Sequence, residues 1–88
     1  MEITLKLFAT LSDYLPRELN GRVRVHNELP LEVVDGMTVQ QVIDQMHLPS
    51  TMTHLVLLNG VYIPPQARAT HPLRAGDALA VWPPIAGG

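Results

Sequence analysis

One helical stretch in an otherwise β-type chain is the feature that most limits what this sequence can fold into. Apolar residues recur between positions 39 and 46 with the i, i+3, i+4, i+7 spacing that gives a helix a single apolar stripe. Thr38 is a candidate N-cap and Pro49 stops the helix, so we expect it to run from Thr38 to about His47. A single helix covers only one face of a sheet, and we expect the other face to contact water. The stripe consists of Val39, Val42, Ile43 and Met46.

The chain before this helix carries β-type residues in two places. Residues 3–7 alternate apolar and polar side chains, which predicts a strand whose odd-numbered positions face a core, with Phe8 on the opposite face. Residues 10–20 are expected to form a turn or two of helix at most, because Pro16 lies in their middle. Residues 23–34 favour one strand with an irregular approach.

The chain after the helix contains a hairpin signal and a last strand. Asn59-Gly60 lies between two apolar runs and supplies the two positive φ values of a type I′ turn. In residues 78–82, odd-numbered and even-numbered side chains are expected to face opposite ways, and Leu73 is expected to fill part of the core. The order strand, strand, helix, strand, short strand, strand predicts an α+β fold in which one main helix packs on one face of a mixed sheet.

Composition excludes several classes of function. The net charge is −2 and the six Lys and Arg residues are spread along the chain, so we expect no nucleic-acid partner. The chain has no cysteine, which rules out disulfides, thiolate metal sites and a thiol nucleophile. We expect no metal site, because the four histidines match no common zinc spacing. No apolar run approaches the roughly 20 residues that cross a bilayer, and no export signal opens the chain, so we expect no membrane partner and a cytoplasmic location.

The end of the chain is the stretch most suggestive of chemistry. Two prolines hold such a tail extended and end the preceding strand, while a terminal Gly-Gly can enter a slot too narrow for other residues. We therefore divide the chain into a domain at 1–82 and a tail at 83–88, although terminal glycines can also be a frayed end. The tail consists of Pro83, Pro84, Ile85, Ala86, Gly87 and Gly88.

The order of elements and this tail together resemble the ubiquitin-like β-grasp sulfur carriers, with most similarity to the small subunit of molybdopterin synthase. The resemblance rests on residues 3–9, 38–43, 59–60, 73–77 and 81–88. It implies that the first and last strands lie side by side and parallel in the sheet centre. If Leu58 pairs with Val61, and if Val61 and Ile63 face the core, four residues share the exposed face and form a docking patch for another protein. These four are Phe8, Leu57, Tyr62 and Trp82; a register shifted by one residue would bury them instead.

The resemblance also implies a chemistry for the tail. An E1-like (ubiquitin-activating-type) adenylyltransferase would transfer AMP from ATP to Gly88, and a sulfur donor would replace AMP to leave a thiocarboxylate. The tail would then enter the large subunit of molybdopterin synthase and donate its sulfur to the pterin that later binds molybdenum or tungsten. This chain has neither a GxxxxGK[ST] phosphate loop nor a cysteine, so it is expected to bind no cofactor and to leave ATP binding to its partner. It is a carrier more than a catalyst.

Two alternatives remain open. The first keeps the carrier chemistry but changes the acceptor, for instance to thiamine thiazole. The second is a ubiquitin-like modifier or an interaction module without sulfur chemistry. The Pro-Pro-Ile-Ala sequence before the glycines favours the molybdopterin type by resemblance, whereas residues 20–31 look longer than the compact family pattern.

Overall fold

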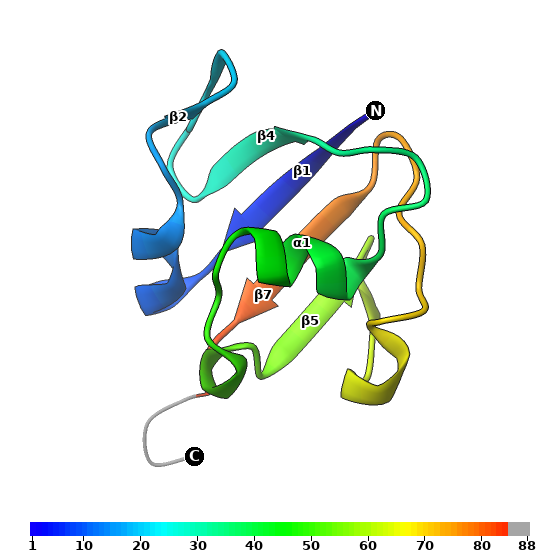
Figure 1. Cartoon of the computed structure of the whole chain (residues 1–88). Helices are drawn as coiled ribbons and strands as arrows, with labels where there is room; N and C mark the ends of the chain where they lie inside the picture. Colours follow the sequence, from blue (N-terminus) through cyan, green and yellow to red (C-terminus); the bar gives the residue numbers. More distant parts are fainter. Residues whose placement is uncertain (85–88) are drawn as a thin grey trace.

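The computed structural model describes residues 1–84 and contains one main helix packed on one face of a five-stranded mixed sheet (Figure 1). The strand order is β4-β1-β7-β5-β6. This confirms the predicted α+β fold. The strands are β1 (Glu2–Leu7), β4 (Glu28–Glu32), β5 (Leu55–Leu58), β6 (Val61–Tyr62) and β7 (Ala78–Trp82).

The centre of the sheet is the predicted parallel pair of first and last strands. β1 and β7 run parallel with Leu5 opposite Leu79, and both of these side chains are fully buried. β4 and β5 flank the pair and run antiparallel to it. Odd-numbered residues of β1 and β7 therefore face α1 and form the core, as the alternation predicted.

Helix α1 (Val39–Gln45) begins where the sequence predicted and ends slightly earlier. The Thr38 hydroxyl accepts from the Gln41 N–H at 3.3 Å, while Gln41 Oε1 accepts from the Thr38 N–H at 2.8 Å. This capping box pairs two N–H groups that the helix itself leaves free. His47, with a φ of 57°, turns the chain away after the last helical turn.

The Asn59-Gly60 turn is confirmed, with φ values of 51° and 84° at its two central residues. The Asn59 side chain does more than turn the chain: its Oδ1 accepts from the Ala78 N–H at 2.8 Å and its Nδ2 donates to Asp77 Oδ1 at 2.9 Å. The β5–β6 hairpin is thereby joined to the beginning of β7.

The one strand predicted within residues 23–34 is β4, reached by an irregular stretch, but the hairpin before it was not predicted. Residues 18–23 form a separate hairpin of β2 (Glu18–Leu19) and β3 (Arg22–Val23), which projects beyond β4 (Figure 1). Asn20 and Gly21 both have positive φ and make its turn. His26, at a φ of 55°, then turns the chain into β4.

Burial at β6 also differs from the prediction. Val61 was expected to face the core, but it is 64% exposed, whereas Ile63 is buried. Val61 pairs with Leu58 and so lies on the core side of the sheet. It follows directly after the turn in the two-residue edge strand, where the core has already ended.

Short 3₁₀ helices occupy the remaining connections. η1 (Ala9–Tyr14) ends before Pro16 and buries Leu11. It is the turn or two of helix that was expected in residues 10–20. η2 (Ser50–Met52) and η3 (Pro65–Ala67) were not predicted. Leu73 is buried in the core, as predicted. Within residues 1–84, none of the helices has the length and apolar character that a membrane crossing requires.

Candidate functional site

The sheet face opposite α1 carries the side chains that the sequence analysis assigned to a docking patch. Ala80 and Trp82 of β7 point to this face, while Leu79 and Val81 are buried on the other. Phe8 follows the end of β1 and donates its backbone N–H to the Val81 carbonyl at 3.1 Å. The ends of the two central strands are thus held together.

Phe8 and Trp82 stack on one another. Their ring centroids lie 4.0 Å apart and their planes differ by 8°. Both side chains are half-buried, so each ring covers part of the other and still presents surface to solvent. Trp82 is the last residue of β7, and the stack therefore lies at the point where the tail begins.

The β5–β6 hairpin contributes Leu57 and Tyr62, the other two predicted residues, in the predicted register. Leu57 lies opposite Tyr62 on one side and opposite Ala80 on the other, so all three share a face. Tyr62 is 49% exposed and Leu57 is half-buried. The structure places the two pairs on one sheet face.

Leu55 is a member of this face that the sequence analysis missed. It lies opposite Trp82 in the β5–β7 ladder and is 36% exposed. The signal was available, because Leu55 and Leu57 are two residues apart in one strand and must share a face. We define the apolar sheet face by six residues: Phe8, Leu55, Leu57, Tyr62, Ala80 and Trp82.

The tail begins directly at this face. Pro83 is half-buried and Pro84 is exposed, and neither has an N–H that could continue the ladder. The last ladder contact of β7 is made by the Trp82 carbonyl, which accepts from the His54 N–H at 3.1 Å. The predicted reactive residue Gly88, together with Ile85, Ala86 and Gly87, lies outside the described residues.

Arg68 supports the approach to β5 and was not predicted. Its side chain is buried, at 4% exposure, in the connection between β6 and β7. The guanidinium donates from Nε to the Ile63 carbonyl at 3.0 Å and from Nη1 to the Thr53 carbonyl at 2.9 Å. Nη2 lies 3.4 Å from the carbonyl of His54, the residue whose N–H holds the end of β7. Arg68 therefore supports the beginning of the tail through the backbone of residues 53–54.

Comparison with known proteins places this architecture in a family. Residues 5–88, nearly the whole chain, match the ThiS family. The chain belongs to the ThiS family. The chain is thus a ubiquitin-like β-grasp protein of the type that comprises sulfur carriers and ubiquitin-like modifiers, and the resemblance found in the sequence is confirmed. Among curated proteins, none matches the chain significantly.

Solved structures share the fold of this ThiS-family chain. The Haloferax volcanii HVO 2177 protein is 28% identical with a TM-score of 0.68, over 100% of this chain and 87% of that one. H. volcanii small archaeal modifier protein 1 is 23% identical with a TM-score of 0.61, over 96% of this chain and 98% of that one. One chain of the complex of subunits 1 and 2 of molybdopterin-converting factor from Helicobacter pylori is 16% identical with a TM-score of 0.58. The match covers 100% of this chain and 100% of that one.

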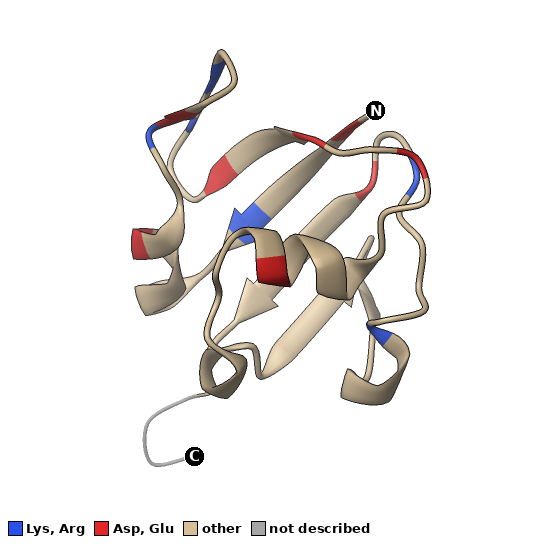
Figure 2. Cartoon of the chain, in the orientation of Figure 1, with Lys and Arg blue, Asp and Glu red and all other residues tan. Residues whose placement is uncertain are grey.

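Charge separates the two halves of the ThiS-family domain. β5, β6 and β7 contain no Lys, Arg, Asp or Glu, whereas Figure 2 shows charged residues on β1, β4 and the β2–β3 hairpin. The three strands that carry most of the apolar sheet face are therefore uncharged, and Lys6 of β1 lies at the edge of the face, opposite Ala80. In the described part of the chain, no three His, Asp or Glu side chains come together in a way that could hold a metal ion.

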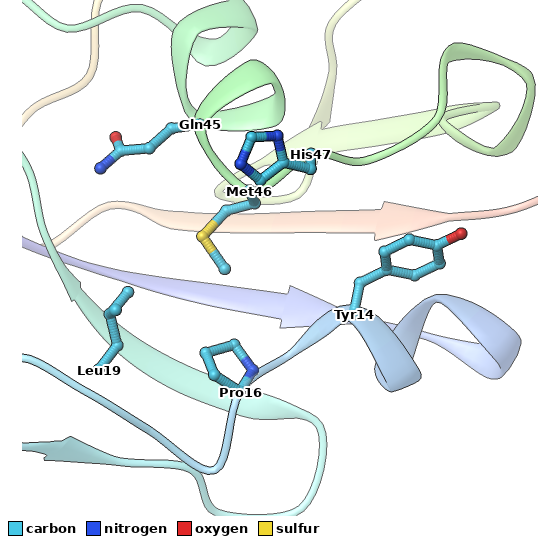
Figure 3. A pocket seen from close by; sticks show the side chains of 6 residues that line it. All are labelled: Tyr14, Pro16, Leu19, Gln45, Met46 and His47. Carbon is cyan, nitrogen blue, oxygen red and sulfur yellow. The ribbon is translucent and has the colours of Figure 1, made fainter.

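A hollow on the helix side of the domain contains none of the predicted site residues. It has a volume of about 300 Å³ and lies between the end of α1 and the segment from η1 to β2. Figure 3 shows the Met46 side chain directed toward the space between Leu19 and Pro16. This hollow belongs to the opposite side of the sheet from the apolar sheet face. Its lining residues are Tyr14, Pro16, Leu19, Gln45, Met46 and His47.

Proposed function

We propose that this ThiS-family protein is a sulfur carrier whose Gly88 carboxylate is adenylated, converted to a thiocarboxylate and used in the synthesis of molybdopterin. One observation carries the proposal: the apolar sheet face crosses the uncharged strands β6, β5 and β7 and ends at Trp82, where the tail begins, with Lys6 of β1 at its edge opposite Ala80. A partner that binds this face has the tail leading into it. Residues 1–82 are then the docking domain and residues 83–88 the tail that enters the partner.

The chemistry requires activation of the tail by a partner. A carboxylate is a poor electrophile, so a Gly88 oxygen first attacks the α-phosphorus of ATP and expels pyrophosphate. A sulfide equivalent from a sulfur donor then attacks the acyl carbon, AMP leaves with the C–O electron pair, and the thiocarboxylate remains. The ATP site and the donor belong to an E1-like adenylyltransferase and its sulfur source, and this activation by ATP fits action in the cytoplasm.

The proposed receiving partner is the large subunit of a molybdopterin synthase. The support is the likeness in fold to one chain of the H. pylori complex of subunits 1 and 2 of molybdopterin-converting factor. The exposed apolar residues fit such a partner, because aromatic side chains are enriched in protein interfaces and charged ones are depleted at their centres. The thiocarboxylate sulfur would pass to the pterin precursor inside that subunit.

Intact mass after co-expression with the adenylyltransferase and sulfur donor tests the carrier chemistry. The unaltered chain is expected to gain the mass difference of one sulfur for one oxygen. Gly88→Val is expected to gain nothing, because its side chain blocks the slot that admits glycine. Val25→Thr, a change at an exposed position between the β2–β3 hairpin and β4, serves as the control and should gain the same mass as the unaltered chain. Normal sulfur loading of Gly88→Val, with an unchanged melting temperature, would contradict the proposal.

Co-purification with the large subunit tests the docking face separately. Leu57→Lys inserts a charge at the centre of the apolar sheet face and is expected to weaken the complex by at least about tenfold. Val25→Lys introduces the same side chain at an exposed valine away from this face and should leave the affinity unchanged. Equal affinities of the two variants would show that the partner binds elsewhere.

A modifier role is the second candidate, favoured by the likeness in fold to H. volcanii small archaeal modifier protein 1. In that case the Gly88 acyl group passes to lysine amines of other proteins, and a ladder of larger conjugates appears on a gel. Sulfur loading without conjugates, followed by transfer to a thiazole precursor and not to a pterin, would assign the carrier to another sulfur pathway.

A further inference from the structure

Two arginines flank the open end of the β2–β3 hairpin. The Arg24 N–H donates to the Arg17 carbonyl at 2.8 Å, which extends the ladder by one pair beyond Glu18 and Val23. Arg17 and Arg24 are therefore cross-strand neighbours, an arrangement that is destabilising for two like charges. Within residues 1–84, no carboxylate lies within 4.0 Å of either guanidinium, although Arg22 on the same hairpin pairs with Glu2 and Glu32.

Arg24 is held in place with donors to spare. Its Nη1 donates to the Leu15 carbonyl at 3.0 Å, and its Nε donates to the His26 carbonyl. A guanidinium has five N–H donors, so three remain without a partner in the described chain. The Arg17 side chain donates no hydrogen bond to any residue between 1 and 84. Unused donors on a positioned guanidinium favour an oxyanion that can accept several hydrogen bonds at once.

The two arginines line one hollow. Arg17, Val23, Arg24 and His26 line an open hollow of about 540 Å³ at the surface. The chain as a whole is acidic, with a net charge of −2, so this concentration of positive charge does not reflect its general composition. Val23, 60% exposed, adds an apolar wall beside the cations.

We propose that this hollow binds a small phosphorylated molecule, with its phosphate group between Arg17 and Arg24. A phosphate dianion neutralises both guanidiniums, whereas a single carboxylate neutralises one. His26 lines the same space and would add a third polar contact, and Val23 would contact the apolar part of the ligand. The site lies on the hairpin and shares no residue with the apolar sheet face or the tail, so it is independent of the proposed carrier function.

An NMR titration of the full chain, followed through the amide signals at constant ionic strength, tests the proposal. Phenyl phosphate is the main probe, benzoate tests a carboxylate on the same ring, and inorganic phosphate tests the head group alone. We expect saturable shifts confined to residues 15–26 with both phosphates, tighter binding of phenyl phosphate than of inorganic phosphate, and at least about tenfold weaker binding of benzoate. Equal binding of benzoate, or shifts that do not saturate, would overturn the assignment.

Substitutions on one hairpin separate a site from a general charge effect. Arg17→Gln removes a side chain that makes no hydrogen bond within the described chain, and it is expected to weaken phenyl phosphate binding at least about tenfold. Arg22→Gln removes the same charge on the same hairpin outside the hollow and should leave the affinity within about twofold. Arg24→Gln also loses the carbonyl contacts that hold the loop, so Arg17→Gln is the decisive variant. Equal losses for Arg17→Gln and Arg22→Gln would refute a defined site.

Discussion

The aromatic rings of Phe8 and Trp82 are stacked, with centroids 4.0 Å apart and planes within 8° of parallel. Phe8 follows β1 and Trp82 ends β7, so the contact joins residues that are far apart in sequence at the ends of the two central strands. It fixes the orientation of the last side chain before the tail. The same two rings are thus part of the fold and of the proposed docking face.

A double-mutant cycle measures how much the stack contributes to stability. Phe8→Ala, Trp82→Ala and the double variant are expected to give a coupling free energy of about 0.5–1.5 kcal/mol, the range for aromatic pairs beyond simple burial. Urea unfolding followed by circular dichroism supplies the four values. A cycle between Trp82→Ala and Val25→Ala, in the segment that joins the β2–β3 hairpin to β4, should give a coupling near zero. Additive effects in the Phe8–Trp82 cycle would mean that the stacking contact does not contribute to the free energy of unfolding.

Replacement of the buried Arg68 by Met should destabilise the fold strongly. The side chain volume is nearly kept, but the carbonyls of Thr53 and Ile63 lose a charged donor inside the protein, at an expected cost of about 3 kcal/mol. Thermal unfolding should show a fall of more than about 10 °C for a domain of this size. Arg68→Lys should recover only part of the loss, because one ammonium cannot match the planar fork.

The control for Arg68 is Arg74→Met, at an exposed position, where a change within about 0.5 kcal/mol is expected. Hydrogen exchange adds a local measurement: the His54 N–H, which bonds to the Trp82 carbonyl, should exchange faster in Arg68→Met. Unchanged protection at His54, after correction for global stability, would separate Arg68 from the beginning of the tail.

Asn59 has two roles that substitutions can separate. Asn59→Gly keeps a residue that accepts a φ of 51° but removes both side-chain hydrogen bonds to β7 and its preceding turn. Asn59→Ala removes these bonds and also strains the turn. We expect costs of about 1–2 kcal/mol for Gly, from the unpaired Ala78 N–H, and about 1 kcal/mol more for Ala. Chemical denaturation gives both values, and equal stabilities of the two variants would show that the turn conformation carries no cost.

Acid stability should depend in part on Glu32. A hydrogen bond from the Met1 ammonium, the charge of that ammonium and the nearby Arg22 lower the pKa of the Glu32 carboxyl below its ordinary range. A lowered pKa stabilises the folded state above the ordinary glutamate pKa of about 4.3, and this contribution is lost as the pH falls through the lowered value. Because the pair is exposed, the effect is expected to be small and screened by salt.

Comparison of Glu32→Gln with the unaltered chain checks the sign. The variant should be slightly less stable at pH 7, and the difference should shrink toward pH 2 and in 1 M salt, as measured by urea midpoints. A variant whose stability deficit grew on acidification would contradict the assigned direction of the pKa shift.

The tail and docking predictions came partly from local pattern and partly from the family resemblance. Alternation placed Trp82 and Ala80 on one face, and the turn at Asn59-Gly60 set the pairing of Leu57 with Tyr62. The parallel pairing of β1 with β7, which brings Phe8 to Trp82, came only from the resemblance. No local rule chooses which distant strand lies beside which.

What the sequence alone determined was therefore local: the capped amphipathic helix, the Asn-Gly turn and the alternation within the longer strands. These features depend on a few neighbouring residues and on fixed backbone geometry. The tertiary structure decided the β2–β3 hairpin, because strands of two residues are too short to show a period. It decided the exposure of Val61, because burial depends on where the core ends. It also decided the role of Arg68, whose carbonyl partners lie five to fifteen residues away and have no side-chain pattern to reveal them.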